Sequence, residues 1–181
     1  MNIAQLLEDN RIFASKTDRR LLERLVEEGQ KPIATVISCS DFRVPVEVIF
    51  NQLEPGKLFV IRVAGNVVAD SSVKGSIEYA IEHLKTPYLI VLAHTECGAT
   101  KAYLEGIRKG EAGKLLSCIK IKSRELSKAV IENMELQVKI VLEMGCVKRA
   151  LGKGEIEVYG MHYDLGTGKA NILSKNGVRT A

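Results

Sequence analysis

The sequence contains no tryptophan, few prolines and no apolar segment long enough to cross a membrane. Its longest plainly apolar run covers residues 88–93, whereas a transmembrane helix needs roughly 20 apolar residues. The first ten residues include Glu8 and Asp9, where a secretion signal would have a basic start and an apolar centre. We therefore expect a cytoplasmic protein without a membrane partner.

An excess of one charge is also missing. The 26 basic and 22 acidic residues leave a formal net charge of +4, and the basic residues are scattered along the chain. Nucleic-acid binding needs basic side chains that cluster on one face or helix. We therefore expect no nucleic-acid partner.

Cysteine is scarce as well, with four residues in the chain. In a reducing compartment such cysteines are more often free thiols or metal ligands than disulfides. Cys118 and Cys146 lie inside helical patterns without polar neighbours, so we expect them to be inert core residues. Cys39 and Cys97, by contrast, stand beside side chains that can carry chemistry.

Hydrophobic periodicity predicts one domain, residues 1–181, built from alternating strands and helices. Apolar runs rich in β-branched residues predict buried strands at 33–38, 58–61 and 87–93. Helices are expected at 45–53 and from a cap at Ser71 or Ser72 to residue 84. Short strand–helix–strand units imply right-handed crossovers and a parallel sheet covered on both faces.

The two ends of the chain carry further elements. A helix is predicted at 17–28, capped by Thr17 and stopped by Gly29, with a shorter one at 3–9. Residues 99–144 are predicted to be mainly helical with an interruption near 110–113, and residues 155–173 alternate like a strand before a turn at 166–168. The predicted fold class is α/β: a central, mainly parallel β-sheet flanked by helices, with an antiparallel C-terminal edge strand or hairpin.

Two short motifs follow the first and third predicted strands. Residues 39–43 read Cys-Ser-Asp-Phe-Arg, and residues 94–98 read His-Thr-Glu-Cys-Gly. In open α/β sheets ligands bind beyond the carboxyl ends of the strands, where neighbouring crossovers diverge. Two thiolates and one imidazole leave zinc an open fourth position, which is typical of a catalytic site. Either motif alone is more often part of a core, but together they predict zinc bound by Cys39, His94 and Cys97.

These motifs resemble the hallmark of the β-carbonic anhydrases, Cys-x-Asp-x-Arg followed further along the chain by His-x-x-Cys. Other segments resemble the family in the same order, so the likeness covers nearly the whole chain: 55–62, 64–66, 76–80, 97–99 and 158–168. The resemblance implies one Zn²⁺ per chain and reversible hydration of CO₂ to bicarbonate and a proton by zinc-bound hydroxide. Asp41 would then accept a hydrogen bond from the hydroxide while Arg43 grips Asp41 with two parallel donors. The alternatives are an ordinary surface ion pair or an aspartate that itself ligates zinc.

The resemblance also assigns a substrate pocket. It implies that Gln30 and the backbone of Gly98 bind substrate oxygens, and that Phe59 and Tyr79 line an apolar pocket for CO₂. Core packing is the alternative for Phe59. His83 lies one helical turn beyond Tyr79, and histidine is the residue type that most often shuttles protons; an ordinary surface histidine is the alternative.

The family has two pocket types, and two positions distinguish them here. Gln30 matches the glutamine of the permanently open type. The other type carries tryptophan at the position of Val36, as part of an inhibitory bicarbonate site, so the resemblance implies an open site without that switch. Val63 and Phe42 depart from the family's usual asparagine and serine, which puts substrate preference and rate in question.

Competing functions share parts of this pattern. One is hydrolysis of carbonyl sulfide or carbon disulfide with the same ligands, and another is a non-catalytic zinc-binding protein in which Asp41 fills the fourth position. Thiol redox chemistry would need a Cys-x-x-Cys pair, which the sequence lacks. The resemblance implies a homodimer or homotetramer in which N-terminal helices cover a neighbour and two chains share a site.

Overall fold

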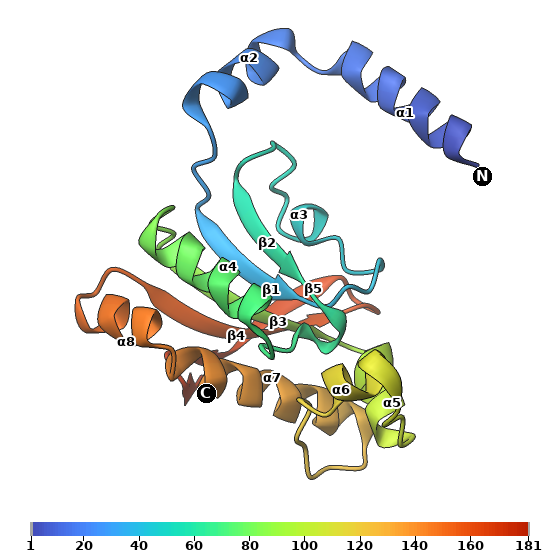
Figure 1. Ribbon diagram of the computed structural model, residues 1–181, viewed down its shortest axis with the longest axis vertical. Coiled ribbons are helices and arrows are strands. Elements are labelled where there is room, and N and C mark those ends of the chain that lie inside the picture. Colours follow the sequence, from blue (N-terminus) through green and yellow to red (C-terminus); the bar gives the residue numbers. More distant parts are fainter. Residues whose placement is uncertain (1, 181) are drawn as a thin grey trace.

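The structure of the protein, a computed structural model, describes residues 2–180 and is built around one twisted sheet (Figure 1). The strand order is β2-β1-β3-β4-β5-β6. The first four strands pair in parallel, and β5 and β6 join in antiparallel fashion. The strands are β1 (Ala34–Ser38), β2 (Leu58–Arg62), β3 (Tyr88–His94), β4 (Glu157–Asp164), β5 (Lys169–Lys175) and β6 (Val178–Arg179). The predicted fold class is confirmed.

The centre of the sheet is the most apolar part of the chain. Every residue of β1 is buried, and β1 pairs with β2 on one side and β3 on the other, so that Val36 lies level with Val60 and Ile90. Buried parallel strands need side chains that suit both faces. The β-branched run that predicted this strand therefore marks the middle of the sheet.

The main helices pack on one face of the sheet only. These are α4 (Ser71–Glu82), α7 (Leu126–Leu142) and α8 (Gly145–Gly152). Their side chains form one core with the strands, in which Ile77, Met134 and Val147 are fully buried. Asp70, rather than Ser71 or Ser72, caps α4, because its side chain accepts a hydrogen bond from Val73 N at 3.0 Å.

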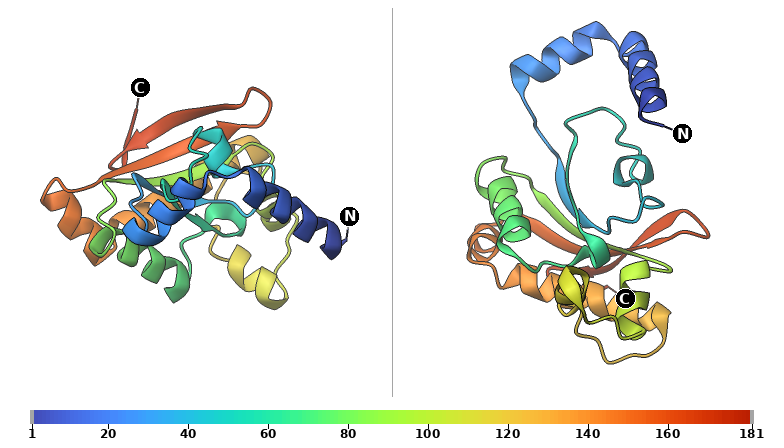
Figure 2. Two further views of the ribbon diagram at one scale, coloured as in Figure 1. Left: turned by 90° about the horizontal axis from the view of Figure 1, so that it is seen from above. Right: turned by 45° about the vertical axis from the view of Figure 1, so that its right-hand side comes forward.

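The opposite face carries only the short helix α3 (Val46–Ile49) within the described chain (Figure 2). Ile90 and Met161 on this face are only partly buried. The expectation of a sheet covered on both faces is therefore wrong for a single chain. The helix predicted for 45–53 is also shorter than expected, because Asn51 has a left-handed φ of 52° that ends it.

The predicted helical stretch 99–144 is divided differently from the expectation. It contains α5 (Gly98–Leu104), α6 (Gly110–Leu116) and α7, and residues 117–125 are not helical. Residues 110–113 begin α6 instead of interrupting a helix. Gly113 lets the main chain of α6 pass close to the main chain of Arg108, since a Cβ at this position would lie 2.1 Å from the carbonyl carbon of Arg108. Cys118 is consequently outside any helix and half-buried, whereas Cys146 is buried in α8, which begins just after the predicted helical stretch ends.

Two N-terminal helices, α1 (Ile3–Lys16) and α2 (Arg19–Glu28), form an arm that projects away from the sheet (Figure 1). Neither contains a buried residue. The first helix is longer than the predicted 3–9, and Asp18 instead of Thr17 caps the second by accepting a hydrogen bond from Arg20 N at 2.9 Å. Gly29 ends α2 with a left-handed φ of 66°, as predicted. Within residues 2–180, every helix is too short or too polar to span a membrane.

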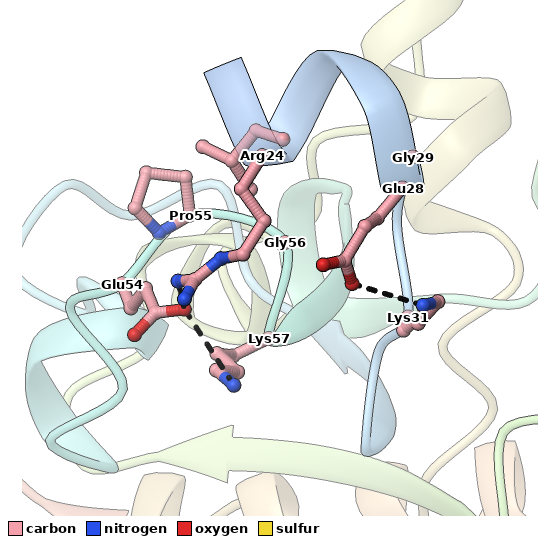
Figure 3. Close-up of a pocket in the computed structure, with 9 residues that line it drawn as sticks. Arg24, Glu28, Gly29, Lys31, Glu54, Pro55, Gly56 and Lys57 are labelled. Atoms are coloured by element: carbon pink, nitrogen blue, oxygen red, sulfur yellow. Dashed lines mark hydrogen bonds and ion pairs between the residues drawn. The ribbon is translucent and has the colours of Figure 1, made fainter. Parts of the chain in front are cut away.

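Charged side chains line the joint between the arm and the body (Figure 3). A cleft of about 320 Å³ separates α2 from residues 54–57, just before β2. Arg24 bridges it with an ion pair to Glu54 at 2.8 Å, and Leu25 packs near Gly56. The arm therefore leaves the body at the amino-terminal end of the strands.

Candidate metal centre

The two predicted motifs meet at the carboxyl ends of β1 and β3. These strands are neighbours, yet the chain leaves β1 toward β2 and leaves β3 toward β4, on opposite sides. Diverging crossovers open a crevice at this point in a parallel sheet. Cys39 directly follows β1, His94 is the last residue of β3, and Cys97 precedes the first turn of α5.

Three side chains in this crevice are arranged to hold a metal ion. One ligand atom from each of Cys39, His94 and Cys97 lies within 4.8 Å of the other two, and all three residues are buried. The imidazole is oriented by its Nδ1, which lies 2.8 Å from the carbonyl oxygen of Thr95. Its Nε2 is buried and has no hydrogen-bond partner among residues 2–180. Because buried polar atoms are normally paired, this unpaired nitrogen beside two sulfurs fits a zinc ion.

The two thiols interact with each other. The pKa of Cys97 is lowered chiefly because Cys39 donates a hydrogen bond to its sulfur, and the N–H groups of Thr100 and Ala99 at the start of α5 act in the same direction. The same bond is the main reason why the pKa of Cys39 is raised. The pair thus favours one thiolate, and the lowered pKa favours it on Cys97. Zinc ligands must be deprotonated, so binding of a metal would release the proton that remains on Cys39.

The turn from 94 to 98 is held by the neighbouring strand. Thr95 donates its N–H to the carbonyl oxygen of Tyr163 at 3.0 Å, and its hydroxyl accepts a hydrogen bond from Leu165 N at 2.9 Å. Glu96 adopts a left-handed φ of 54°. This tight turn brings Cys97 back toward His94, which explains why the His-x-x-Cys spacing can chelate.

Asp41 and Arg43 form a clamp at the edge of the three ligands. Arg43 Nε donates to Asp41 Oδ1 at 3.0 Å and Nη2 donates to Oδ2 at 2.6 Å. These bonds are the main reason why the pKa of Asp41 is lowered to about 2, so the carboxylate is ionised at neutral pH. Asp41 Oδ2 lies 4.0 Å from His94 Nε2. Arg43 Nη2 also donates to the carbonyl oxygen of Glu96 at 3.2 Å, which ties the two motifs together.

Arg62, at the end of β2, is a site residue that the sequence reasoning missed. Its Nη2 donates to the main-chain oxygen of Asp41 at 2.6 Å, and its Nε donates to that of Cys39 at 3.3 Å. Arg62 therefore fixes the backbone that carries the side chains of Cys39 and Asp41. Arg62 lies in the segment 55–62 that resembles the family, but no spacing rule predicts its contact with the candidate metal centre.

Comparisons with known proteins agree with this geometry. A sequence profile described as carbonic anhydrase matches residues 34–170, most of the chain. The chain belongs to the β-carbonic anhydrase family. It is 32% identical over 164 residues to a carbonic anhydrase of Mycolicibacterium smegmatis, an alignment that covers 83% of this chain and 79% of that protein.

Solved structures of β-carbonic anhydrases share the whole architecture. The Coccomyxa enzyme in complex with acetazolamide superposes with a TM-score of 0.84 at 30% identity, over 96% of this chain and 87% of that one. One of two tetrameric enzymes from Sordaria macrospora gives a TM-score of 0.84 at 25% identity, over 98% of both chains. The chain is thus a carbonic anhydrase in sequence and in fold.

The residues expected to bind substrate divide into two groups in this β-carbonic anhydrase. Gly98 stands next to Cys97 at the start of α5. Phe59 and Tyr79 lie together, with ring centroids 6.3 Å apart, and His83 stacks on Tyr79 at 5.2 Å. This aromatic group lies near the other end of the sheet, because Phe59 is level with Thr35, the second residue of β1.

Gln30 lies still further from the candidate metal ligands of its own chain. It is exposed and precedes β1, whereas Cys39 follows the same strand. At a rise of about 3.3 Å per residue, the strand alone places the two ends roughly 17 Å apart. Within one chain, Gln30 and Cys39 are therefore too far apart to share a site.

Proposed function

We propose that this chain catalyses the reversible hydration of CO₂ to bicarbonate and a proton, with one zinc ion held by Cys39, His94 and Cys97. The observation that supports this most directly is the buried group of two sulfurs and an unpaired imidazole nitrogen beside the Asp41–Arg43 clamp. When bound, zinc supplies a Lewis acid that lowers the pKa of a coordinated water from about 15.7 toward 7. Protein side chains would orient the water, bind the substrate and carry away the proton.

Asp41 would orient the attacking water. An ionised carboxylate can only accept hydrogen bonds, so an O–H group bonded to Asp41 has its oxygen lone pair free for CO₂. Arg43 keeps the carboxylate from rotating, because two parallel bonds fix the plane of the group. Because Arg43 binds both carboxylate oxygens, Asp41 is held as a hydrogen-bond acceptor. This argues against a non-catalytic site in which Asp41 permanently occupies the fourth zinc position.

Gln30, Phe59 and Tyr79 would serve the metal centre of a second copy of the chain. Their distance from their own Cys39 supports this, as does the sheet face that α3 alone covers. The exposed apolar side chains of the arm, Ile3, Leu7 and Phe13 among them, suit contact with another copy. One similar structure is described as tetrameric. We therefore propose a homodimer or homotetramer in which each substrate pocket is completed across an interface.

His83 is proposed as the residue that carries the product proton to solvent. It is exposed and stacks on Tyr79, so it would stand at the rim of the completed pocket. Each 181-residue chain would act as one domain, because the strands, α4, α7 and α8 share a continuous core.

The decisive experiment compares Asp41→Ala with the wild-type protein in zinc content and in stopped-flow CO₂ hydration. We expect Asp41→Ala to keep zinc and lose most of the turnover. Asp164→Ala is a matched control, because this aspartate lies at the carboxyl end of β4 and its side chain accepts a hydrogen bond from Gly166 N, in the turn that follows, at 2.7 Å. Unchanged turnover in Asp41→Ala would remove the proposed role of this residue.

Substrate preference is tested in the same preparation. Phe42 is 87% exposed beside the clamp, in the position where the family commonly has serine. Carbonyl sulfide and carbon disulfide should therefore be assayed in parallel with CO₂. Faster turnover of either sulfur compound would replace the proposed substrate while leaving the metal centre in place.

A further inference from the structure

Two buried amide side chains on α7 form a network that the proposed reaction does not use. Asn133 and Gln137 are fully buried, one helical turn apart, and both face the 3₁₀ turn η1 (Ala64–Asn66) and the residues after it. A buried amide must satisfy both its oxygen and its nitrogen. The directions of the amide oxygen and nitrogen therefore show which group each side chain binds.

The main chain determines the orientation of both amides. Val68 N–H can only donate, and it donates to Gln137 Oε1 at 2.8 Å. Gln137 Nε2 consequently points the other way and donates to Asn133 Oδ1 at 3.0 Å. This leaves Asn133 Nδ2 to donate to the carbonyl oxygen of Gly65 at 2.8 Å.

Gly65 in turn contacts the metal centre. Its N–H donates to Cys39 Sγ at 3.3 Å. Its φ is +71°, and an added Cβ would lie 3.2 Å from both Ala99 and Ile119, so the position requires glycine. Because glycine is the residue with the greatest backbone freedom, the direction of this N–H depends on contacts from elsewhere.

We propose that Asn133, oriented by Gln137, is a positioning residue that holds Gly65 so that its N–H stays on the sulfur of Cys39. A hydrogen bond to a thiolate withdraws electron density from the sulfur and sets how strongly it donates to a metal. The amide pair therefore tunes the metal centre from α7 without touching it. This inference rests on the proposed metal site.

Cobalt substitution tests the effect at the sulfur itself. In the Co²⁺ protein, we expect Asn133→Ala to move the sulfur-to-cobalt charge-transfer band to longer wavelength, because a sulfur without its N–H partner gives up an electron more easily. Zinc affinity, measured by competition with a chromophoric chelator, should fall about 10- to 100-fold, as is usual when support behind a ligand is lost. Asn133→Leu keeps more of the side-chain volume while removing the donor, so it covers the case in which the alanine variant does not fold.

Met134→Leu is the matched control. Met134 is the next residue of α7 and is also fully buried, but it packs in the apolar core. Its band and zinc affinity should equal those of the wild type. The inference would be overturned if a folded Asn133 variant kept the wild-type band and zinc affinity, or if Met134→Leu shifted both equally. Either result would leave the proposed metal site in place. A wild-type protein without any sulfur-to-cobalt band would contradict the proposed metal site as well.

Discussion

Mixing two inactive variants tests whether one pocket is built from two chains. Cys39→Ser removes a metal ligand but leaves the opposite end of the sheet intact. Gln30→Ala leaves the metal ligands intact and removes a proposed substrate contact. Roughly 17 Å of strand β1 separates the two positions within one chain, and the glutamine side chain cannot span it.

The expected gain follows from counting sites. In an equal mixture with free exchange of subunits, a metal-competent chain faces a Gln30-bearing partner in about a quarter of all sites, because each condition is met with a chance of about one half. CO₂ hydration per chain should therefore rise to about a quarter of the wild-type value. If Gln30 acted within its own chain, the mixture would show only the average of the two separate preparations.

A second mixture controls for subunit exchange and stability. Cys39→Ser and Asp41→Ala both damage the metal end, so no pairing of these two chains produces a complete site, and turnover should not rise. Native mass spectrometry of differently tagged chains would establish that exchange has occurred. Exchanged assemblies of Cys39→Ser and Gln30→Ala without a gain in turnover would refute the shared pocket.

Three further substitutions test individual contacts. Arg43→Lys keeps the charge but cannot make the two bonds to Asp41 and the bond to Glu96 at once; we expect kcat/KM for CO₂ to fall about tenfold while zinc content, measured by atomic emission, stays constant. Arg62→Gln loses two bonds to main-chain oxygens, and urea titration should show a loss of about 1 to 2 kcal/mol; an unchanged midpoint would contradict this role. Lys85→Gly relieves a left-handed φ of 56° after α4 and should raise the free energy of unfolding by about 0.5 to 1 kcal/mol, whereas a lower melting temperature would show that the strain is absent.

The meeting of Cys39, His94 and Cys97 could be predicted from sequence because strand direction is a strong constraint. Once two apolar, β-branched runs were interpreted as neighbouring parallel strands, Cys39 and His94 had to emerge at the same edge of the sheet. The close approach of their ligand atoms agrees with this. Helix boundaries were less predictable, because Gly110 and Gly113 serve a left-handed turn and a close backbone contact that only the folded chain reveals.

The same constraint shows where the predicted pocket was incomplete. Gln30 and Cys39 flank a single strand, so the spacing that predicted β1 also separates these residues in space. The resemblance implies a site shared by two chains, but not which chain contributes each of these residues. The contact between Arg62 and the backbone at residues 39–41 was missed for another reason, since it joins positions far apart in sequence through main-chain atoms.

The proposed metal binding and the proposed substrate binding would therefore depend on different parts of the molecule. The three proposed ligands are buried and supported inside one chain, by Gly65 N–H at Cys39 and by the β4 contacts of Thr95 near His94. The proposed substrate contacts lie at the far end of the sheet and would need a neighbouring chain to reach a metal centre. The contacts that hold the proposed metal centre come from one chain, whereas the proposed pocket needs a second chain. Dissociation of the proposed homo-oligomer would therefore abolish turnover before the metal is lost.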